Sequence, residues 1–377
     1  MDWLIRMQEE NGSLLSVMNL SYGSPPSSAT GDSFYGPPNT VATRSGAAAF
    51  ALGSKVFGQF EALEDYANEL RNRALDAWAW AEANPSVTFN NSGQVAAGEQ
   101  ETNDYGRFTT EMVAAIQLYD LTGEASYRER VENNYRDINM FQWNFVFVFQ
   151  PEIQHRMLYF ASLPGITPSV ANDIRTTYGN AVNNGEHNWV AINTARDAYR
   201  AHLQNYTWGS NRSHATQGLI FYDQYAYNAG SPGQAQARNA ALRHVNYLHG
   251  VNPLGKVYLS NMGDFGAYNS VDSFFHGWFV DGSPNWDSVS GSNFGPAPGF
   301  LVGGPNPSYS WDNCCPTSCG GSQNNAMCVV LSPPSGQPDQ KSYLDFNTSW
   351  PVNSWSVTEN SNGYQLQYIR LLSKFVN

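Results

Sequence analysis

The first three quarters of the chain carry hydrophobic residues at helical spacing. Leu63, Leu70 and Ala74 recur at multiples near 3.6 positions within residues 61–83, which is the period of one helix face. Residues 44–57 are apolar on almost every side, as expected for a buried helix. Glycine and proline separate the segments, so we expect antiparallel helix pairs joined by short loops. Further helices are predicted at residues 107–122, 125–139, 153–163, 168–184, 212–229, 233–249 and 363–376.

Residues 250–352 follow neither a helix nor a strand period. They are rich in Gly, Pro, Ser, Asn and aromatic residues. A long irregular segment of this kind is typical of a functional surface carried by a rigid scaffold. The helical periods predict an all-α fold of roughly ten helices. No linker divides the chain, so we expect a single domain spanning residues 1–377.

The first residues have the pattern of the middle of an amphipathic helix, with Trp3, Leu4 and Met7 on one face. They lack the basic segment and apolar run of a signal peptide. We therefore expect that part of the domain lies upstream of residue 1.

Composition limits the classes of partner. The chain has 20 basic and 32 acidic residues, a net charge of −12, and only 14% charged residues. An acidic chain repels phosphates, and no apolar stretch of about 18 residues is present, so we expect neither nucleic-acid binding nor membrane insertion. We expect a monomer.

Aromatic residues also make up 14% of the chain, and many lie in the predicted loops. Sugar rings have apolar C–H faces that stack on aromatic rings, and hydroxyl edges that bind amides and carboxylates. The alternative is that most of these rings pack the core, where Trp is usually well buried.

Four cysteines lie within fifteen residues: Cys314, Cys315, Cys319 and Cys328. A bridge between the adjacent Cys314 and Cys315 would be strained, which leaves two pairings, each joining one of these to Cys319 and the other to Cys328. A zinc site is the alternative, but the spacing lacks the paired C-x2-C of structural zinc. Disulfides are favoured, and they indicate an extracellular protein.

Common catalytic motifs are absent: the sequence contains no phosphate-binding loop, no G-x-S-x-G and no H-E-x-x-H. Glu359 lies before the last predicted helix in an aromatic, weakly charged segment. Burial there would raise its pKa, as a general acid requires. The alternative is a carboxylate that caps the helix. His276 follows Asp272-Ser273-Phe274-Phe275, although a lone histidine is more often structural.

Several segments together resemble glycoside hydrolase family 9. Residues 247–255 (Tyr-Leu-His-Gly-Val-Asn-Pro-Leu-Gly) are similar to its Y-L-x-G-x-N-P-L-G signature, and residues 295–306 resemble a second one. Residues 208–211, His276 and Glu359 follow the order and spacing of further motifs. The resemblance runs from residue 1 to 377.

The resemblance implies an (α/α)6 barrel with a substrate cleft built by the loop-rich C-terminal segment. It implies a secreted endo-β-1,4-glucanase that hydrolyses cellulose or cello-oligosaccharides with inversion. An exo-acting cellobiohydrolase or glucosidase/glucosaminidase-like enzyme, an enzyme acting on another polysaccharide such as chitosan, and a glucan-binding protein without activity are the alternatives.

The resemblance also implies roles for individual residues. Glu359 would be the general acid, and His276 would contact sugar beside the scissile bond. The residues expected to bind substrate are Tyr35, Trp208, Trp278 and Tyr309. No cofactor is required, although loops rich in Asp and Asn could hold a structural calcium ion.

Two departures from the family pattern concern the active site. The usual His-Arg is here His276-Gly277, and the D-A-G-D motif that carries the general base is absent. We expect the base upstream of residue 1, because nothing distinguishes Asp272, Asp281 or Asp287 in the loops.

Overall fold

The computed structural model divides the chain into two compact units. Unit 1 comprises Met1–Asn144 and Glu152–Thr177, and unit 2 comprises Phe145–Pro151 and Tyr178–Asn377. The structure describes residues 1–20, 31–91, 101–230, 233–275, 283–309, 318–330, 337–348 and 353–376.

Unit 1 is built mainly from helices, with one antiparallel strand pair in which Asn19 lies opposite Phe34. Its elements are α1 (Asp2–Arg6), β1 (Met18–Leu20), β2 (Ser33–Tyr35), α2 (Thr40–Phe57), η2 (Glu61–Leu63), α3 (Glu64–Ala83), α4 (Asp104–Thr122), α5 (Ala125–Asn134), η3 (Tyr135–Asp137), α6 (Asn139–Trp143), most of α7 (Pro151–Ser162) and the first part of α8 (Pro168–Asn184).

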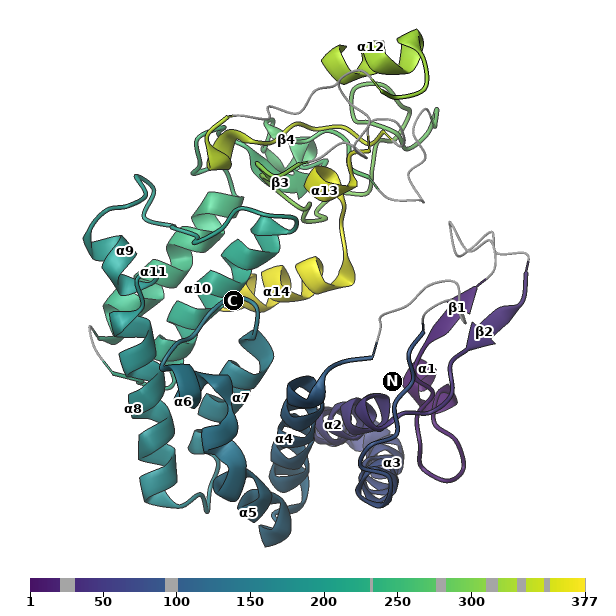
Figure 1. Ribbon diagram of the computed structural model, residues 1–377, viewed down its shortest axis with the longest axis vertical. Helices are drawn as coiled ribbons and strands as arrows, with labels where there is room; N and C mark the ends of the chain where they lie inside the picture. Colours follow the sequence, from purple (N-terminus) through teal and green to yellow (C-terminus); the bar gives the residue numbers. More distant parts are fainter. Residues whose placement is uncertain are drawn as a thin grey trace. The chain divides into compact units, whose positions relative to one another are not determined.

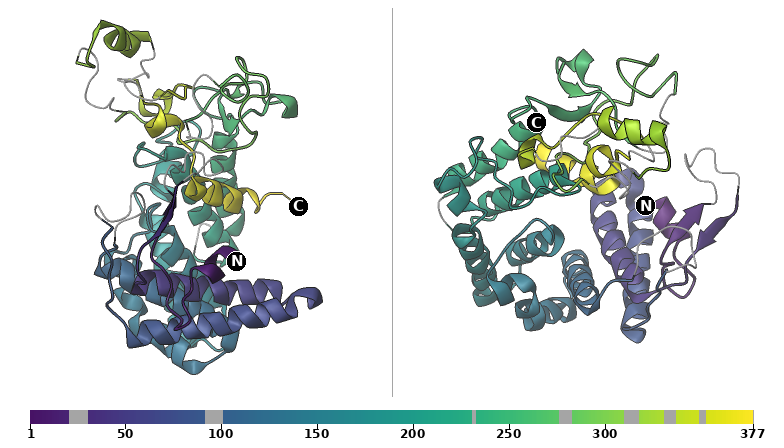
Figure 2. Two further views of the ribbon diagram at one scale, coloured as in Figure 1. Left: turned by 90° about the vertical axis from the view of Figure 1, so that its right-hand side faces the viewer. Right: turned by 45° about the horizontal axis from the view of Figure 1, so that its top comes forward.

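Small side chains let α2 pack closely against α3 and α4, beside which it lies in Figures 1 and 2. Ala47 and Ala51 of α2 and Ala74 of α3 are fully buried. Interiors pack at high density, so alanine at these contacts brings the helix backbones together.

One ion-pair network, in which Arg44 is buried, connects α2, α3, α4 and α5 of unit 1. Nη2 of the buried Arg44 in α2 lies 2.7 Å from Oε2 of Glu111 in α4. Arg130 of α5 pairs with the same Glu111 and, at 2.6 Å, with Glu82 of α3. A buried guanidinium needs such partners because its desolvation is costly.

Unit 2 contains the loop-rich part of the chain. Its further elements are α9 (Trp189–Asn193), α10 (Ser210–Ala226), α11 (Gln234–Leu248), β3 (Val257–Ser260), η4 (Gly263–Phe265), β4 (Ser270–Val271), α12 (Ser322–Val330), η5 (Asp339–Lys341), α13 (Trp355–Thr358) and α14 (Asn362–Leu372). The strands β3 and β4 pair in parallel, with Val257 opposite Ser270.

Helix α10 is the central helix of unit 2 and packs against α11 and α14 (Figures 1 and 2). Gly218 permits the close approach of α14, because a Cβ atom there would lie 2.6 Å from Cδ2 of Leu371.

The long predicted helices are confirmed. The helix expected at 168–184 is α8, with the same bounds. The helix expected at 44–57 begins four residues earlier in the structure, because the Asn39 side chain accepts a hydrogen bond from Ala42 N and caps α2. The short α6, α9, α12 and α13 have too few residues for a detectable period and were not predicted.

The predicted N-terminal helix is α1, but its expected apolar face is not buried as a unit. Met7, just beyond the helix, is buried, whereas Trp3 is exposed. In the part of the chain that the structure describes, no helix has both the length and the apolar character that a bilayer span requires.

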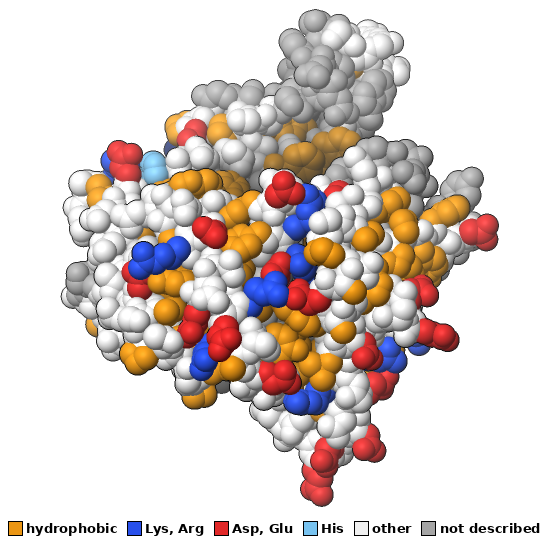
Figure 3. Space-filling view, turned by 60° about the horizontal axis from the view of Figure 1, so that its bottom comes forward, with side chains coloured by type: hydrophobic (Ala, Val, Ile, Leu, Met, Phe, Trp, Pro, Cys, Tyr) orange, Lys and Arg blue, Asp and Glu red, His pale blue; other side chains and the backbone are white. Residues whose placement is uncertain are grey.

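Charges of both signs lie together on one face of the surface. On the face shown in Figure 3, acidic and basic side chains are close to each other, with hydrophobic side chains between them.

Two neutral histidines are buried in the core of unit 2. Nδ1 of His214 in α10 lies 3.2 Å from Nδ1 of His244 in α11. Nε2 of His214 lies 3.1 Å from the Tyr206 hydroxyl, and its imidazole ring stacks on Tyr247 with centroids 3.8 Å apart. Burial lowers the pKa of both histidines, that of His244 from 6.5 to about 3.

We predict that acid destabilises the protein through this pair. Because the folded-state pKa of His244 is depressed, only the unfolded chain binds the proton between pH 6.5 and 3. The stability is complete above pH 6.5 and falls as the pH drops, by about 2 kcal/mol for His244 between pH 7 and pH 5. Urea unfolding at pH 7 and pH 5 should show that the free energy of unfolding falls less between the two pH values in His244→Gln than in the native chain. His155→Gln, in unit 1, is the control, and an equal pH dependence in all three proteins would contradict the prediction.

Candidate active site

Glu359 lies between α13 and α14, where the chain is extended, with ψ of 143°. Ser361, not Glu359, caps α14, since its side chain accepts a hydrogen bond from Tyr364 N. The capping role that was the alternative for Glu359 is therefore taken by another residue, and the Glu359 carboxyl is available for chemistry.

Trp208 contacts the Glu359 carboxyl directly. Its indole Nε1 donates a hydrogen bond of 3.1 Å to Oε2 of Glu359, although 151 residues separate them. Trp208 stands just before α10, and its side chain is 51% exposed. The next residue, Gly209, has φ of +79°, and a Cβ there would lie 2.9 Å from the Tyr364 hydroxyl. Glycine therefore allows the turn that presents Trp208.

The surroundings of Glu359 favour its protonated form. Burial raises the pKa of its carboxyl, and the hydrogen bond from Trp208 opposes part of that rise because it stabilises the charged form. The nearby Tyr364 has its pKa raised to about 12, first by burial and then by the Glu359 charge. A raised pKa is the shift that a carboxyl needs in order to act as a general acid.

Two loop residues fix the main chain just before Glu359. Asn306 Nδ2 donates a hydrogen bond of 3.0 Å to Ser356 O, and Gly304 N donates one of 2.8 Å to Val357 O. Both donors lie in the second family-like segment, residues 295–306, so that segment supports Glu359 through the backbone.

Thr358 links the main chain just before Glu359 to two other loops. Its hydroxyl donates a hydrogen bond of 2.6 Å to Phe346 O and accepts one of 3.3 Å from Phe275 N. Phe275 immediately precedes His276, which lies outside the described residues, as does Trp278.

Gly304 approaches α10 too closely for any side chain. It has φ of +97°, and a Cβ there would lie 2.5 Å from Cγ of the buried Asn211. Asn211 N donates a hydrogen bond of 2.9 Å to Gly303 O, and Asn211 Nδ2 donates one of 3.0 Å to Val302 O. The turn at Gly303–Gly304 therefore holds both the start of α10, just after Trp208, and the backbone that carries Glu359.

Three aromatic rings surround this point. Trp208 and Trp355 are stacked, with centroids 6.4 Å apart, and Phe275 meets Trp355 edge-on at 5.8 Å. Trp355 is 36% exposed. It is one of the aromatic residues of the predicted loops, but nothing in its spacing relates it to Trp208. The exposed rings offer a flat apolar surface of the kind that a sugar face can cover.

Tyr309 and Tyr35, which were also expected to bind substrate, are not among the described rings that contact Trp208 or Trp355. Tyr309 is buried and its hydroxyl donates a hydrogen bond to Asn353 O, so it supports the loop before α13. This burial disfavours direct contact with sugar. Tyr35 is exposed on β2 in unit 1.

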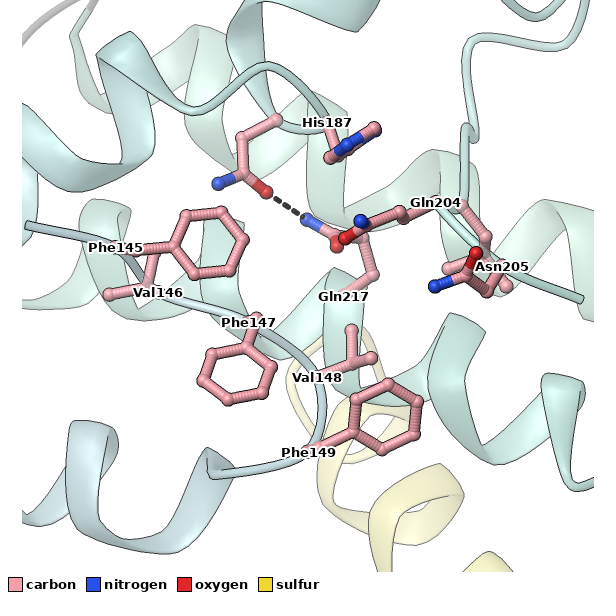
Figure 4. Close-up of a pocket in the computed structure, with 11 residues that line it drawn as sticks. Phe145, Val146, Phe147, Val148, Phe149, His187, Gln204, Asn205 and Gln217 are labelled. Atoms are coloured by element: carbon pink, nitrogen blue, oxygen red, sulfur yellow. Dashed lines mark hydrogen bonds between the residues drawn. The ribbon is translucent and has the colours of Figure 1, made fainter. Parts of the chain in front are cut away.

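A further pocket in unit 2 combines aromatic and amide side chains (Figure 4). Phe145, Phe147 and Phe149 project from one loop, and the first two rings stack with centroids 5.3 Å apart. Opposite them, Gln217 Nε2 donates a hydrogen bond of 2.7 Å to Asn188 Oδ1. The buried Asn188 Nδ2 has no hydrogen-bond partner among the described residues. The alternation of phenylalanine and valine over residues 145–149 could have indicated this pocket, but it was not singled out from the sequence.

Two of the loop aspartates that could have supplied the base, Asp272 and Asp287, are engaged in structural contacts. Asp272 accepts two hydrogen bonds of 3.1 Å from Ser290, and Asp287 accepts one of 2.7 Å from Asn347 Nδ2. Asp281 lies outside the described residues. No group of three or more His, Cys, Asp or Glu side chains suited to a metal ion occurs in the described ranges.

Cys319 and Cys328 are both buried, and their sulfur atoms lie 3.5 Å apart. Cys314 and Cys315 lie outside the described residues, so neither predicted pairing is described.

Comparison with known proteins identifies the family. The sequence model of glycosyl hydrolase family 9 matches residues 1–365. The chain belongs to this family. Endoglucanase C of Cellulomonas fimi is 24% identical over 344 residues, which cover 86% of this chain and 26% of that protein. A xyloglucan-specific endo-β-1,4-glucanase of Bacteroides ovatus is 24% identical over 383 residues, which cover 96% of this chain and 57% of that protein.

The structural comparison shows the fold. An endoglucanase mutant from Alicyclobacillus acidocaldarius superposes with a TM-score of 0.72 at 18% identity, over 99% of this chain and 63% of that one. Family 9 structures have an (α/α)6 barrel, so the predicted fold class is confirmed. The chain spans about a quarter of the first curated relative and less than two thirds of the second and of this structure.

We predict that Gly304→Ala disrupts the turn under Glu359. Alanine at position 304 would be strained by the positive φ and would also clash with Asn211. Gly266 has a similar φ of +88°, but nothing lies within 4 Å of its Cβ position. Gly266→Ala therefore reports the backbone cost alone. Urea unfolding should show Gly304→Ala to be less stable than Gly266→Ala by about 1–3 kcal/mol. Equal losses in the two variants would show that the close contact is unimportant.

We predict that Trp208→Phe raises the pKa of Glu359. The phenyl ring keeps the site apolar but removes the N–H donor that stabilises the carboxylate. The pKa can be followed by carbon-13 NMR of labelled glutamate carboxyls, with the Glu359 signal assigned by its loss in Glu359→Gln. Trp286→Phe, in a separate loop, should leave the titration unchanged. A lower or identical pKa in Trp208→Phe would refute the assignment of this hydrogen bond.

Proposed function

We propose that the protein is an endo-β-1,4-glucanase that hydrolyses cellulose or cello-oligosaccharides with inversion. The observation that carries the proposal is the Glu359 carboxyl, which is half-buried, has a raised pKa and lies beside two exposed tryptophans. The names of both curated relatives describe endoglucanases, one of them specific for xyloglucan, and this supports a β-1,4-glucan as substrate.

In this proposal Glu359 donates its proton to the glycosidic oxygen as the bond to the leaving sugar breaks. Burial raises the pKa of the carboxyl and so favours the protonated form that the step needs, and the Trp208 N–H stabilises the carboxylate that forms. Trp208 and Trp355 would stack against the sugar faces beside the reacting bond.

Inversion requires a second carboxylate that activates water on the opposite face of the sugar, about 6.5–9.5 Å from the acid. We assign no described residue to this role, because Asp272 and Asp287 are held in loop contacts. His276 and Trp278 remain proposed substrate contacts.

We further propose that the protein acts outside the cell as a monomer, with its four cysteines in two disulfides. The burial and proximity of Cys319 and Cys328 support cross-linking in this segment. No cofactor is needed for the proton transfer. A structural calcium ion in an Asp- and Asn-containing loop is part of the same proposal.

We predict that Glu359→Gln removes most of the hydrolytic activity. The amide keeps the shape of the side chain but has no acidic proton, and loss of a general acid costs about 10²–10⁴-fold in rate. The assay measures the release of reducing sugar from a soluble cellulose derivative. It uses the full-length protein.

Glu124→Gln, an exposed carboxylate in unit 1, is the matched control. Product chain lengths in the same assay separate endo from exo action. Equal hydrolysis by the native protein and Glu359→Gln would overturn the proposal, and glucan binding without any hydrolysis would favour a silent binding protein.

A further inference from the structure

The loop of residues 283–294 in unit 2 presents an aromatic pair that the proposed catalytic site does not use. The rings of Trp286 and Phe294 stack with centroids 4.9 Å apart and planes inclined by 29°. Their side chains are nonetheless 44% and 65% exposed. Each ring covers part of one face of the other, and outer ring surface remains open to solvent.

The loop backbone holds the two rings together. Asn293 N donates a hydrogen bond of 2.9 Å to Pro284 O, and Phe294 N donates one of 2.9 Å to Asn285 O. These bonds join the two ends of the loop, so the residues that carry the rings are neighbours across it. Because the rings are already stacked, a ligand would lose little binding free energy in ordering them.

Two side-chain hydrogen bonds anchor this loop region to the rest of unit 2. Asn261 Nδ2 donates a hydrogen bond of 2.8 Å to Pro296 O, and Asn347 Nδ2 donates one of 2.7 Å to Asp287 Oδ1. The loop is therefore anchored next to Trp286 and just after Phe294.

Two amides accompany the rings. Asn285 precedes Trp286 and Asn293 precedes Phe294, and Asn293 Nδ2 donates an exposed hydrogen bond of 3.0 Å to Asn285 Oδ1. That bond leaves the Asn285 amino group and the Asn293 carbonyl with capacity for a ligand. The one charged residue between 283 and 294 is Asp287, whose carboxylate already has a partner.

We propose that this loop, which we call the Trp286 loop, is a second binding site for a neutral β-1,4-linked glucan chain. The ring substituents of such a chain are all equatorial, so each sugar has an apolar C–H face for an aromatic ring and hydroxyls at its edge for the amides. The absence of basic residues in the loop disfavours phosphate-bearing ligands. Two rings are too small a surface for a stable protein interface, which needs about 1,000 Å² or more.

The choice of glucan rests on the function proposed above, and the site would extend it. A chain held at the Trp286 loop has a higher effective concentration at any other glucan site of the same molecule, provided that the chain is long enough to reach both. The loop therefore matters for polymers and not for the shortest oligosaccharides.

The test is native gel electrophoresis through gels that contain hydroxyethyl cellulose, with Glu359→Gln as the background so that the polymer is not cut. Replacing both rings in Trp286→Ala/Phe294→Ala should weaken the apparent affinity for the polymer by about thirtyfold, which corresponds to about 2 kcal/mol for the two stacking contacts together. Phe60→Ala is the control, because Phe60 is 57% exposed in unit 1 and has no part in the loop.

Ring-preserving replacements separate lost binding from lost folding. Trp286→Phe/Phe294→Tyr should keep most of the retardation, and thermal unfolding should show the alanine variant to be folded. Retardation of the alanine variant equal to that of Phe60→Ala would overturn the proposal, as would loss of retardation in the ring-preserving variant. Equal retardation in amylose gels would overturn the assignment to a β-1,4-linked chain.

The two proposals fail in distinguishable ways. If the polymer retards the protein through Trp286 and Phe294 but Glu359→Gln hydrolyses as fast as the native protein, the binding site stands and the catalytic assignment fails. If hydrolysis depends on Glu359 but neither ring affects retardation, the catalytic assignment stands and the Trp286 loop is not a glucan site.

Discussion

The position of the Glu359 carboxyl depends on hydrogen bonds to the main chain of residues 356–358. Donors from Gly304 and Asn306 reach Val357 and Ser356, although about fifty residues separate them in the chain. The segment itself is the single turn α13, which is too short to be stable alone. Glu359 is therefore held by the loops around it, and a change in the Gly303–Gly304 turn reaches the carboxyl through the backbone.

The same arrangement sets the electrostatics of the site. Charged residues form only 14% of the chain, and burial raises the pKa of Glu359 while one neutral N–H donor moderates it. An arginine or lysine in the place of Trp208 would stabilise the carboxylate and remove the proton that a general acid needs. The abundance of aromatic residues thus contributes both the stacking surface of Trp208 and Trp355 and the low polarity around the acid.

Long helices and the family could be predicted from the sequence, whereas the support of the site could not. Helix α8 extends over enough turns for its period to be read, and α2 departs only at its Asn39 cap. Contacts such as Asn211 with Gly303 join residues about ninety positions apart, and no local pattern encodes them. For the same reason, Tyr309 could not be recognised as buried, nor Ser361 as the residue that caps α14.

The central claim is that Glu359 supplies the proton to the leaving group, and the leaving-group dependence of hydrolysis tests it most directly. Aryl β-cellobiosides with phenols of increasing pKa would be compared for the native protein and Glu359→Gln. A good leaving group needs no proton, so we expect the variant to approach the native rate on the dinitrophenyl substrate and to fall steeply as the phenol becomes more basic. Parallel dependence in the two proteins would contradict the account.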